Sequence, residues 1–159
     1  MRGYRGPGRG RRPLGKIATA VFVIIAAPVV ADYVNGWMKA EGDCRLVRVI
    51  DGDTIAMTCA EASQTRLRLS GIDTPELRGG CWQERLLAAR ASLFLRWKLY
   101  RAGQVEVMLS GETDRYDRGL GRLLLDGRAA SGHLLDAGLA RPYLRGDRPW
   151  CDQLKGVPA

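Results

Sequence analysis

Arginines and carboxylates lie close together in the segment 66–76, which reads Arg-Leu-Arg-Leu-Ser-Gly-Ile-Asp-Thr-Pro-Glu. The alternating pattern predicts a strand with Arg68 on its polar face, followed by a turn that carries Asp73 and Glu76. Pro75 keeps the preceding residue out of the helical region, so a continuing helix cannot separate the two carboxylates. An ordinary surface turn would also explain these residues taken alone. A guanidinium beside two carboxylates is costly unless something binds there, which makes the segment a candidate site.

A further carboxylate, Asp53, is expected to lie near Asp73. Residues 44–50 and 54–59 have the β-branched composition of strands, and the turn between them predicts a hairpin that continues into a third strand at 66–70. In such an antiparallel meander, the first turn and the end of the third strand are neighbours. Two carboxylates that close repel unless a cation lies between them. Ca²⁺ suits this position, because it accepts carboxylates, backbone carbonyls and waters.

The remaining elements complete a small α+β fold that is mainly β. Periodicity and turn residues predict a helix over 83–100, strands over 105–109 and 120–125, a polar loop over 111–119, a short helix over 131–137 capped by Ser131 and ended by Gly138, and an irregular tail over 141–151. This element order predicts a five-stranded barrel with two helices, in which the longer helix crosses between the third and fourth strands.

The helix over 83–100 has an apolar row at helical spacing, which predicts the face that packs on the core. This row consists of Leu86, Leu93, Trp97 and Tyr100. The basic residues Arg85, Arg90, Arg96 and Lys98 fall largely off that face. We interpret them as a solvated surface rather than as a binding patch.

The net charge of +8 is concentrated at the N-terminus. Residues 1–16 contain six basic residues and no acid, so the rest of the chain is nearly neutral. The uncharged run at 17–31 is typical of a secretory signal, cleaved after Ala31, or of an uncleaved membrane anchor. A buried core helix is disfavoured because the run is not amphipathic. We expect a basic tail with a signal or transmembrane helix over 1–39 and one folded domain over 40–159.

Such a chain is expected to be exported. An uncleaved N-terminal helix would hold the domain at the periplasmic face of the inner membrane, because the arginine-rich flank stays in the cytoplasm. A cleaved signal would make the protein secreted instead.

The four cysteines, an even number, are consistent with an oxidising compartment. A hairpin with its turn at 51–52 brings Cys44 opposite Cys59, so a disulfide across its open end is expected. Cys81 would then pair with Cys151 and hold the tail in place. A zinc site is the competing explanation, which the single histidine and the lack of a Cys-x-x-Cys pair disfavour.

Three segments together resemble the signature motifs of the thermonuclease family, the staphylococcal-nuclease-like proteins with an OB-fold barrel. They are Val-Ile-Asp-Gly-Asp-Thr at 49–54, Arg-Leu-Ser-Gly-Ile-Asp-Thr-Pro-Glu at 68–76 and Asp-Arg-Tyr-Asp-Arg-Gly-Leu at 114–120. Each motif alone is weak, but the three occur in the family's order with a helix between the second and third. The resemblance covers about residues 44–145.

The resemblance implies a role for the acidic side chains. Asp53 and Asp73 match the family's Ca²⁺-ligating carboxylates, and Thr74 matches the residue that ligates through its backbone carbonyl. Glu76 matches the catalytic glutamate, the general base that orients and deprotonates the attacking water.

The resemblance also implies a role for the basic side chains. Arg68 and Arg118 match the two arginines that grip the scissile phosphate, where negative charge grows in the transition state. Arginine suits this role because its planar fork donates two hydrogen bonds and stays charged. Arg115 and Tyr116 match positions near a terminal phosphate of the bound substrate.

A calcium-dependent endonuclease is therefore implied, which hydrolyses phosphodiester bonds of DNA and RNA with low sequence specificity and leaves 3′-phosphate ends. No protein partner is indicated, and we expect a monomer. The alternatives are a non-catalytic OB-fold nucleic-acid-binding protein and a structural envelope protein. The presence of Arg68, Glu76 and Arg118 together with both aspartates favours catalysis. The chain departs from the family's pattern in a short loop before Cys81 and in its tail, which replaces a C-terminal helix.

Overall fold

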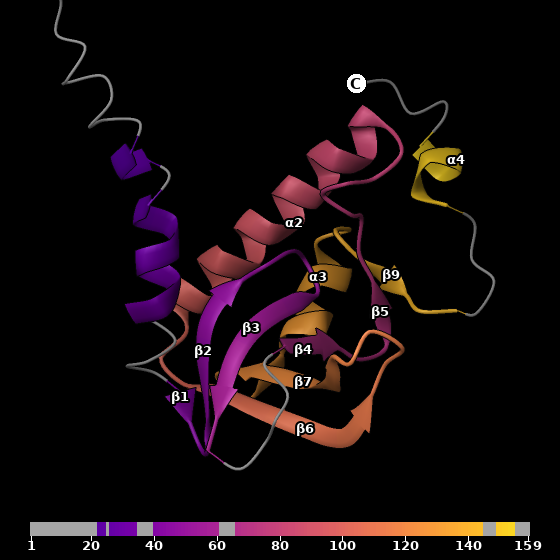
Figure 1. Cartoon of the computed structure of the whole chain (residues 1–159). Coiled ribbons are helices and arrows are strands. Elements are labelled where there is room, and N and C mark those ends of the chain that lie inside the picture. Colours follow the sequence, from indigo (N-terminus) through magenta and orange to yellow (C-terminus); the bar gives the residue numbers. More distant parts are fainter. Residues whose placement is uncertain (1–21, 25, 35–39, 61–65, 145–148, 155–159) are drawn as a thin grey trace, which may run out of the picture.

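The computed structural model describes residues 22–24, 26–34, 40–60, 66–144 and 149–154 (Figure 1). Its strands are β1 (Ala40–Glu41), β2 (Cys44–Val49), β3 (Thr54–Cys59), β4 (Arg66–Leu69), β5 (Ile72–Asp73), β6 (Val105–Thr113), β7 (Gly119–Leu125), β8 (Arg128–Ala129) and β9 (Arg141–Pro142). Its helices are α2 (Trp82–Arg101), α3 (Ala130–Asp136) and α4 (Trp150–Leu154), and a further helix passes through residues 22–24 and 26–34.

The strands curl into a barrel-like sheet with α2 lying across it (Figure 1). β2, β3 and β4 form the predicted antiparallel meander, and β6 pairs with β7 in the same way. β7 then joins the two groups by running parallel to β4. The order β1-β6-β7-β4-β3-β2 returns on itself because β1 leads directly into β2. This is the predicted α+β class with an OB-like barrel.

Alternation along each strand sends apolar side chains into the barrel and polar ones outward. In β4, Leu67 and Leu69 are buried while Arg66 is exposed. The core includes Leu46, Val49, Ile55, Met57, Leu67, Leu69, Val105, Leu123, Leu125 and Leu134. Complete burial of each such side chain stabilises the fold by about 1.5–3 kcal/mol. The polar face of β4 is thereby fixed at the barrel surface, where Arg68 can meet other elements.

The β2–β3 hairpin confirms the predicted pairing of Cys44 with Cys59. The two residues lie opposite each other and are joined by a disulfide. A bulge between Leu46 and Arg48 then shifts the register, so that Arg48 faces Ala56. The regular hairpin expected from the sequence lacks this bulge. The extra residue changes the spacing of the buried side chains from two, between Cys44 and Leu46, to three, between Leu46 and Val49.

α2 packs on the barrel through a face of small residues and two leucines, so the predicted core face of this helix is wrong. Leu86, Leu93, Trp97 and Tyr100 are all more than half exposed. The buried side chains are instead Glu84, Ala88, Ala91, Ser92, Leu95 and Leu99. The reason lies in the turn at 51–53, where a Cβ on Gly52 would stand only 2.9 Å from the Cβ of Ala91. The turn rests directly on the helix, and only a face of small residues leaves room for it.

The basic residues of α2 divide between two situations. Arg85 and Arg90 are exposed, as predicted for a solvated surface. Arg96 instead donates a hydrogen bond of 2.8 Å to the carbonyl of Val49 and so ties the helix to β2.

Two element boundaries also differ from the prediction. β6 continues beyond Leu109 to Thr113, because its antiparallel pairing with β7 extends along the edge of the barrel. α3 begins at Ala130, so Ser131 lies inside the helix and Ala129 takes the N-cap position without a side-chain hydrogen bond. The predicted end at Gly138 is confirmed by a left-handed backbone with φ of 65°.

The C-terminal segment is more regular than predicted. β9 pairs antiparallel with β5, and the short helix α4 follows. The predicted Cys81–Cys151 disulfide joins α4 to the start of α2. α4 therefore stands in addition to the two helices expected for the domain.

The helix through residues 22–24 and 26–34 covers part of the predicted signal or anchor, the rest of which lies outside the described residues. The Asp32 carboxylate accepts a hydrogen bond of 3.2 Å from the Val49 N–H and pairs with Arg96 at 3.4 Å. Within the described part of the chain, no helix has both the length and the apolarity needed to cross a bilayer. The division at 39/40 stays a prediction, and the turn expected at 61–64 is outside the described residues.

Loss of the Cys81–Cys151 disulfide is expected to lower the stability of the domain by about 4 kcal/mol, because the link closes a long loop and restricts the unfolded chain. Thermal unfolding of Cys81→Ser/Cys151→Ser would measure the change in Tm. Cys44→Ser/Cys59→Ser is the matched control, and its sequence separation of 15 against 70 predicts a smaller loss. Equal Tm values for the wild type and Cys81→Ser/Cys151→Ser would contradict this expectation.

Candidate active site

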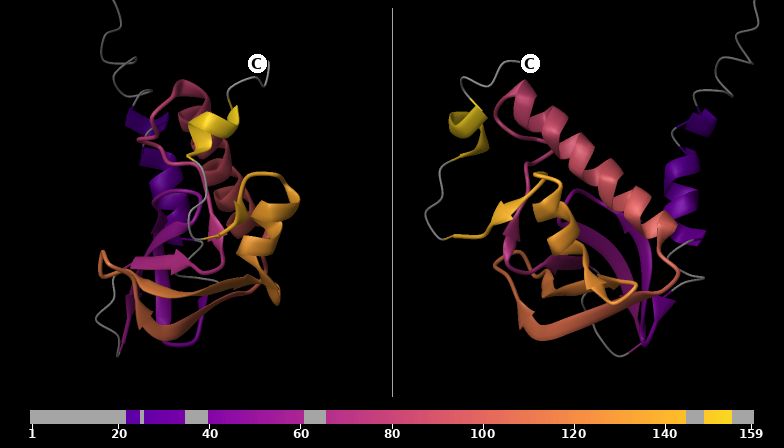
Figure 2. Two further views of the ribbon diagram at one scale, coloured as in Figure 1. Left: turned by 90° about the vertical axis from the view of Figure 1, so that its right-hand side faces the viewer. Right: turned by 180° about the vertical axis from the view of Figure 1, so that it is seen from behind.

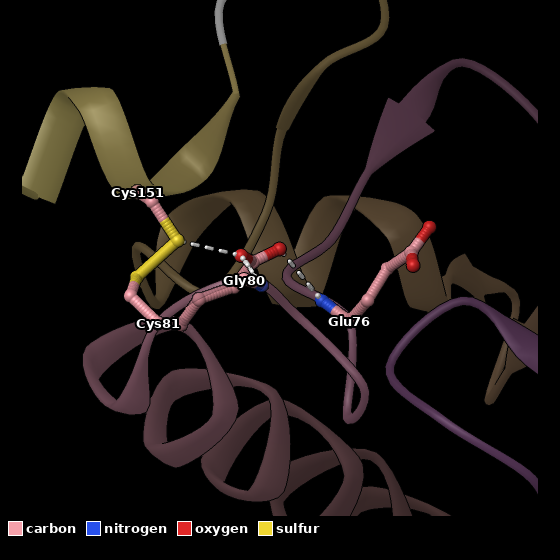
Figure 3. The surroundings of a disulfide bond; sticks show 5 residues. Glu76, Gly80, Cys81 and Cys151 are labelled. Atoms are coloured by element: carbon pink, nitrogen blue, oxygen red, sulfur yellow. Dashed lines mark hydrogen bonds between the residues drawn. A yellow bond between two sulfur atoms is a disulfide. The ribbon is translucent and has the colours of Figure 1, made fainter.

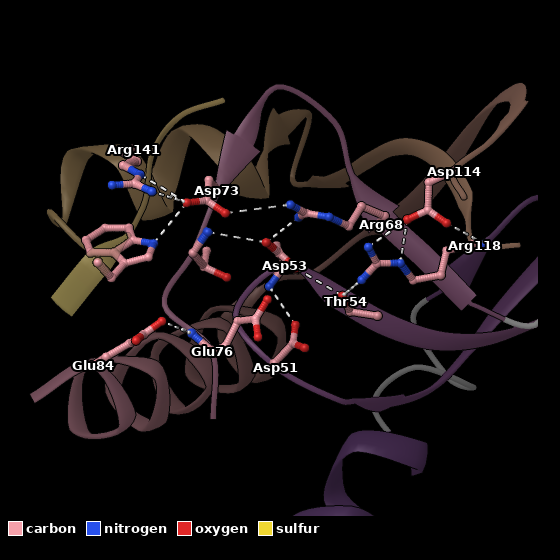
Figure 4. A network of polar contacts seen from close by, with 12 residues as sticks. Asp51, Asp53, Thr54, Arg68, Asp73, Glu76, Glu84, Asp114, Arg118 and Arg141 are labelled. Atoms are coloured by element: carbon pink, nitrogen blue, oxygen red, sulfur yellow. Dashed lines mark hydrogen bonds and ion pairs between the residues drawn. The ribbon is translucent and has the colours of Figure 1, made fainter. Parts of the chain in front are cut away.

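Side chains from the β2–β3 turn, β4, β5 and the start of β7 converge at one end of the barrel (Figure 4). They belong to three stretches that are well separated in sequence. The sheet order brings them together, because β4 lies between β3 and β7. Of the predicted site residues, Asp53, Arg68, Asp73, Thr74 and Arg118 are connected through ion pairs and hydrogen bonds.

Asp53 is the most enclosed acid of this site, with 6% of its surface exposed. Its carboxylate accepts hydrogen bonds from the hydroxyl of Thr54 (3.0 Å) and the N–H of Thr74 (3.3 Å). Burial raises the pKa of Asp53, the Arg68 guanidinium lowers it by less, and nearby Asp51 adds to the rise. The net rise means that the surrounding positive charge does not fully compensate the buried carboxylate.

The Arg68 guanidinium lies between the two predicted metal-binding carboxylates. It pairs with Asp53 Oδ2 on one side, and its Nη2 is 4.0 Å from Asp73 Oδ1 on the other. Both oxygens therefore face the same positively charged group. A divalent cation was expected between these carboxylates, and in the structure the Arg68 guanidinium lies at that position.

Asp73 has partners in the C-terminal segment that the sequence did not reveal. Its Oδ2 accepts hydrogen bonds from Arg141 Nε (3.0 Å) and Trp150 Nε1 (2.9 Å), and Arg141 Nη2 lies 2.8 Å away. The Arg141 guanidinium also stacks 4.5 Å from the Trp150 ring centroid. The tail thus holds one oxygen of Asp73 and leaves the other directed toward Arg68. An arginine, a tryptophan and a cysteine within an otherwise irregular tail are the signal that this segment is anchored.

Glu76 is exposed and sits in a turn organised by Glu84 (Figure 3). The buried Glu84 carboxylate accepts hydrogen bonds from the N–H groups of Glu76 (3.4 Å) and Gly80 (3.1 Å). Its Oε2 also lies 3.0 Å from Cys151 Sγ of the disulfide. With its backbone held in this way, the Glu76 side chain points from the turn toward the 51–53 turn (Figure 4). The sequence did not indicate this role of Glu84, because an acid in the first turn of a helix is common.

Arg118 is held from two sides. Its Nη1 donates to the hydroxyl of Thr54 (3.1 Å), which in turn donates to Asp53. Its Nε and Nη2 lie 2.7 and 2.6 Å from Asp114 Oδ2, and its N–H donates to Asp114 Oδ1. Partial burial raises the pKa of Asp114, but the hydrogen bonds from Arg118 and Tyr116 outweigh this and lower it overall. Asp114 therefore stays ionised and aims the guanidinium, a role that the sequence analysis missed.

Arg115 and Tyr116 lie at the rim of this site on the loop between β6 and β7. The Tyr116 ring is exposed, and the guanidinium groups of Arg115 and Arg118 lie 4.7 and 5.5 Å from its centroid. The structure thus connects both residues with Arg118, next to the carboxylates but not among them.

The residues present fit a hard cation. Asp53 Oδ2 and Asp73 Oδ1 face one point that already attracts positive charge, the Arg68 guanidinium. Thr74, which follows Asp73, is buried and donates its N–H to Asp53. Oxygen donors of this kind match Ca²⁺ rather than a soft metal.

Two arginines that contact a network of carboxylates, with an exposed glutamate beside them, form a site on an OB-like barrel of the class that could bind and act on a phosphodiester. Guanidinium groups can bind a phosphate, and a carboxylate can hold the attacking water.

Comparison with known proteins agrees with this class. The family model described as staphylococcal nuclease homologue matches residues 66–154. The thermonuclease of Staphylococcus hyicus is 30% identical over 137 residues, which cover 79% of this chain and 80% of that protein. The chain belongs to the staphylococcal nuclease family.

Replacing Glu84 is expected to lower turnover about tenfold with little change in KM. Glu84→Gln keeps the size of the side chain but weakens its acceptance of hydrogen bonds from Glu76 and Gly80, each worth about 1 kcal/mol. The exposed Glu106→Gln is the matched control. Separate determination of kcat and KM on DNA distinguishes a displaced Glu76 from weaker substrate binding. A variant with normal kcat would show that the Glu84 contacts do not position Glu76.

Proposed function

We propose that this protein is a calcium-dependent endonuclease that hydrolyses phosphodiester bonds of DNA and RNA with low sequence specificity. The observation that carries this proposal is the convergence of Arg68 and Arg118 on one carboxylate cluster beside Glu76. The similarity to a staphylococcal thermonuclease supports the same chemistry.

In this proposal the two arginines bind the scissile phosphate. Their guanidinium groups would donate to its non-bridging oxygens, where negative charge grows as the attacking water adds. Thr54 and Asp114 hold Arg118 in place before substrate arrives, so little reorganisation is needed. Arg68 would exchange its pairing with Asp53 for the phosphate.

Glu76 would act on the water. Its carboxylate is exposed, as a group that accepts a proton from a solvent molecule must be. It would orient the water opposite the leaving 5′ oxygen and accept its proton as the new bond to phosphorus forms. The P–O5′ bond would break, and the departing oxygen would take a proton from solvent to leave as a 5′-hydroxyl. Arg115 and Tyr116, at the rim, would contact a neighbouring phosphate of the same strand.

Asp53, Asp73 and the Thr74 carbonyl would hold Ca²⁺. When bound, the ion supplies positive charge that offsets the carboxylates and polarises the phosphate. Because Arg68 occupies the same region, its release to the phosphate and ion binding would support each other.

For localisation, we propose that the protein is exported and acts as a monomer. The signal-like run at 17–31, the arginines before it and the disulfides at Cys44–Cys59 and Cys81–Cys151 support an oxidising compartment. The domain would then be either secreted or held at the periplasmic face of the inner membrane.

The test is a nuclease assay on the purified full chain, with plasmid DNA and with single-stranded RNA. We expect cleavage of both in millimolar Ca²⁺, loss of activity with excess EGTA, and recovery when Ca²⁺ is restored. Treatment of the products with a 3′-phosphatase should expose 3′-hydroxyl ends. Nucleic-acid binding without cleavage would indicate a binding protein instead, and cleavage unaffected by EGTA would contradict calcium dependence.

A further inference from the structure

The outward face of α2 carries an apolar row that the barrel does not use. It is formed by Trp82, Leu86, Leu93, Trp97 and Tyr100, whose exposed fractions lie between 53% and 63%. At 100° per residue these side chains fall within a single narrow stripe. The helix buries its opposite face, so this stripe is directed away from the core and from the carboxylate cluster. Large contiguous apolar surfaces of this kind mark interaction sites.

The stripe has positive charge on both edges. Arg85 borders it on one side, and Arg90 and Arg101 border it on the other, all three exposed. The only acid of α2 is Glu84, which is buried on the face that packs on the domain. The outward face of α2 thus has an apolar, aromatic centre, and all of its charged side chains are positive.

The N-terminal helix lies next to α2. Figures 1 and 2 show it beside the C-terminal end of α2, where Asp32 pairs with Arg96. Its exposed side chains are again apolar: Phe22, Val23, Ile24, Val29, Val30, Tyr33 and Val34. The chain that precedes this helix carries the six basic residues of 1–16 and no acid.

We propose that the outward face of α2 docks on the surface of a bilayer rich in anionic lipids. Trp and Tyr favour the headgroup level, where their rings are buried while their polar atoms stay hydrated. Arginines at the edges of an amphipathic helix pair with lipid phosphates. With α2 flat on the bilayer, the barrel and its carboxylate cluster lie on the side away from the lipid and stay open to substrate. The docking requires no membrane-spanning segment.

A second copy of this chain fits the surface less well. Pairing two outward faces of α2 would bring the arginines of one copy (Arg85, Arg90 and Arg101) toward those of the other, without any acid of α2 between them. Repulsion of this kind disfavours a dimer through α2, whereas anionic headgroups neutralise the same arginines.

The test is flotation of the full chain with vesicles of phosphatidylcholine containing 30% phosphatidylglycerol. Leu93→Glu places a carboxylate in the centre of the stripe, at a position whose side chain is 63% exposed. Met108→Glu, on exposed β6, is the matched control. We expect Leu93→Glu to weaken partitioning about tenfold and Met108→Glu to change it less than twofold, since both apolar contact and charge attraction are lost only in the first.

Both variants should keep wild-type nuclease activity, because neither residue contacts the carboxylate cluster, so membrane docking and catalysis are tested separately. Equal flotation of Leu93→Glu and Met108→Glu would overturn the proposal and assign membrane binding to the N-terminal segment. Flotation of the wild type that is equally strong on pure phosphatidylcholine would also overturn it. A dimer in lipid-free solution that Leu93→Glu dissociates would identify a second copy as the occupant instead.

Discussion

Glu76→Gln is expected to lower the turnover of phosphodiester cleavage by about 10²- to 10⁴-fold, the usual contribution of a general base. The amide has nearly the same shape and can still hydrogen-bond to water, but it cannot take up the proton that the water must release. Because Glu76 is exposed and its turn is held through Glu84, the substitution leaves the fold intact. The measurement is kcat on plasmid DNA in saturating Ca²⁺, together with Tm.

Glu112→Gln is the control for this change. Glu112 is an exposed glutamate on β6, so the same chemical replacement should alter kcat by less than twofold. The affinity of Glu76→Gln for DNA, measured by fluorescence anisotropy, is expected to stay near that of the wild type. Full activity of Glu76→Gln would remove this residue from the mechanism and would require another group to accept the proton.

Arg68→Lys is expected to lower turnover by about 10²- to 10³-fold, the range found when one donor to a developing anion is removed. Lysine keeps the positive charge and therefore keeps a partner for Asp53. It cannot present two parallel N–H groups to a phosphate, so the loss isolates the geometry of the guanidinium from its charge. The substitution also tests whether Arg68 serves both the carboxylates and the substrate.

The strand offers a matched control two residues earlier. Arg66 has the same residue type and lies on the same face of β4, but its side chain is exposed. Its neighbour across the sheet is Ala56, whereas the Arg68 guanidinium forms ion pairs with Asp53 and Asp73. Arg66→Lys should leave kcat within twofold of the wild type. Similar losses in Arg66→Lys and Arg68→Lys would mean that general positive charge, rather than a specific phosphate contact, accounts for the effect.

Local chemistry made much of the site predictable. The strand that carries Arg68 and the turn that carries Asp53 were expected, because alternation and turn residues depend on near neighbours in the chain. Asp73 was expected in a turn, but it lies on the short strand β5, which forms only because β9 pairs with it. The Cys44–Cys59 pairing followed from hairpin geometry for the same reason and is confirmed. The resemblance of three ordered motifs to one family is borne out by the family match.

Orientation of α2 depended on packing. Helical periodicity revealed an apolar stripe, but it gave no information on whether the barrel would cover that stripe. The close approach of Gly52 to Ala91 selects the small-residue face for the barrel and turns Trp97 outward. A helix face is buried only where it fits the surface of the barrel, and the sequence of the helix alone does not determine the shape of that surface.

The partners of the catalytic candidates were likewise settled only in three dimensions. Asp73 meets Trp150 across 77 positions of sequence, and Arg118 meets Thr54 across 64. Such contacts follow from the β5–β9 pairing and from the parallel alignment of β4 with β7. The sequence showed which residues could bind a phosphate or a cation, because this ability depends on the type of side chain. Their mutual distances depended on the closed barrel, since only the sheet order brings remote turns to the same end.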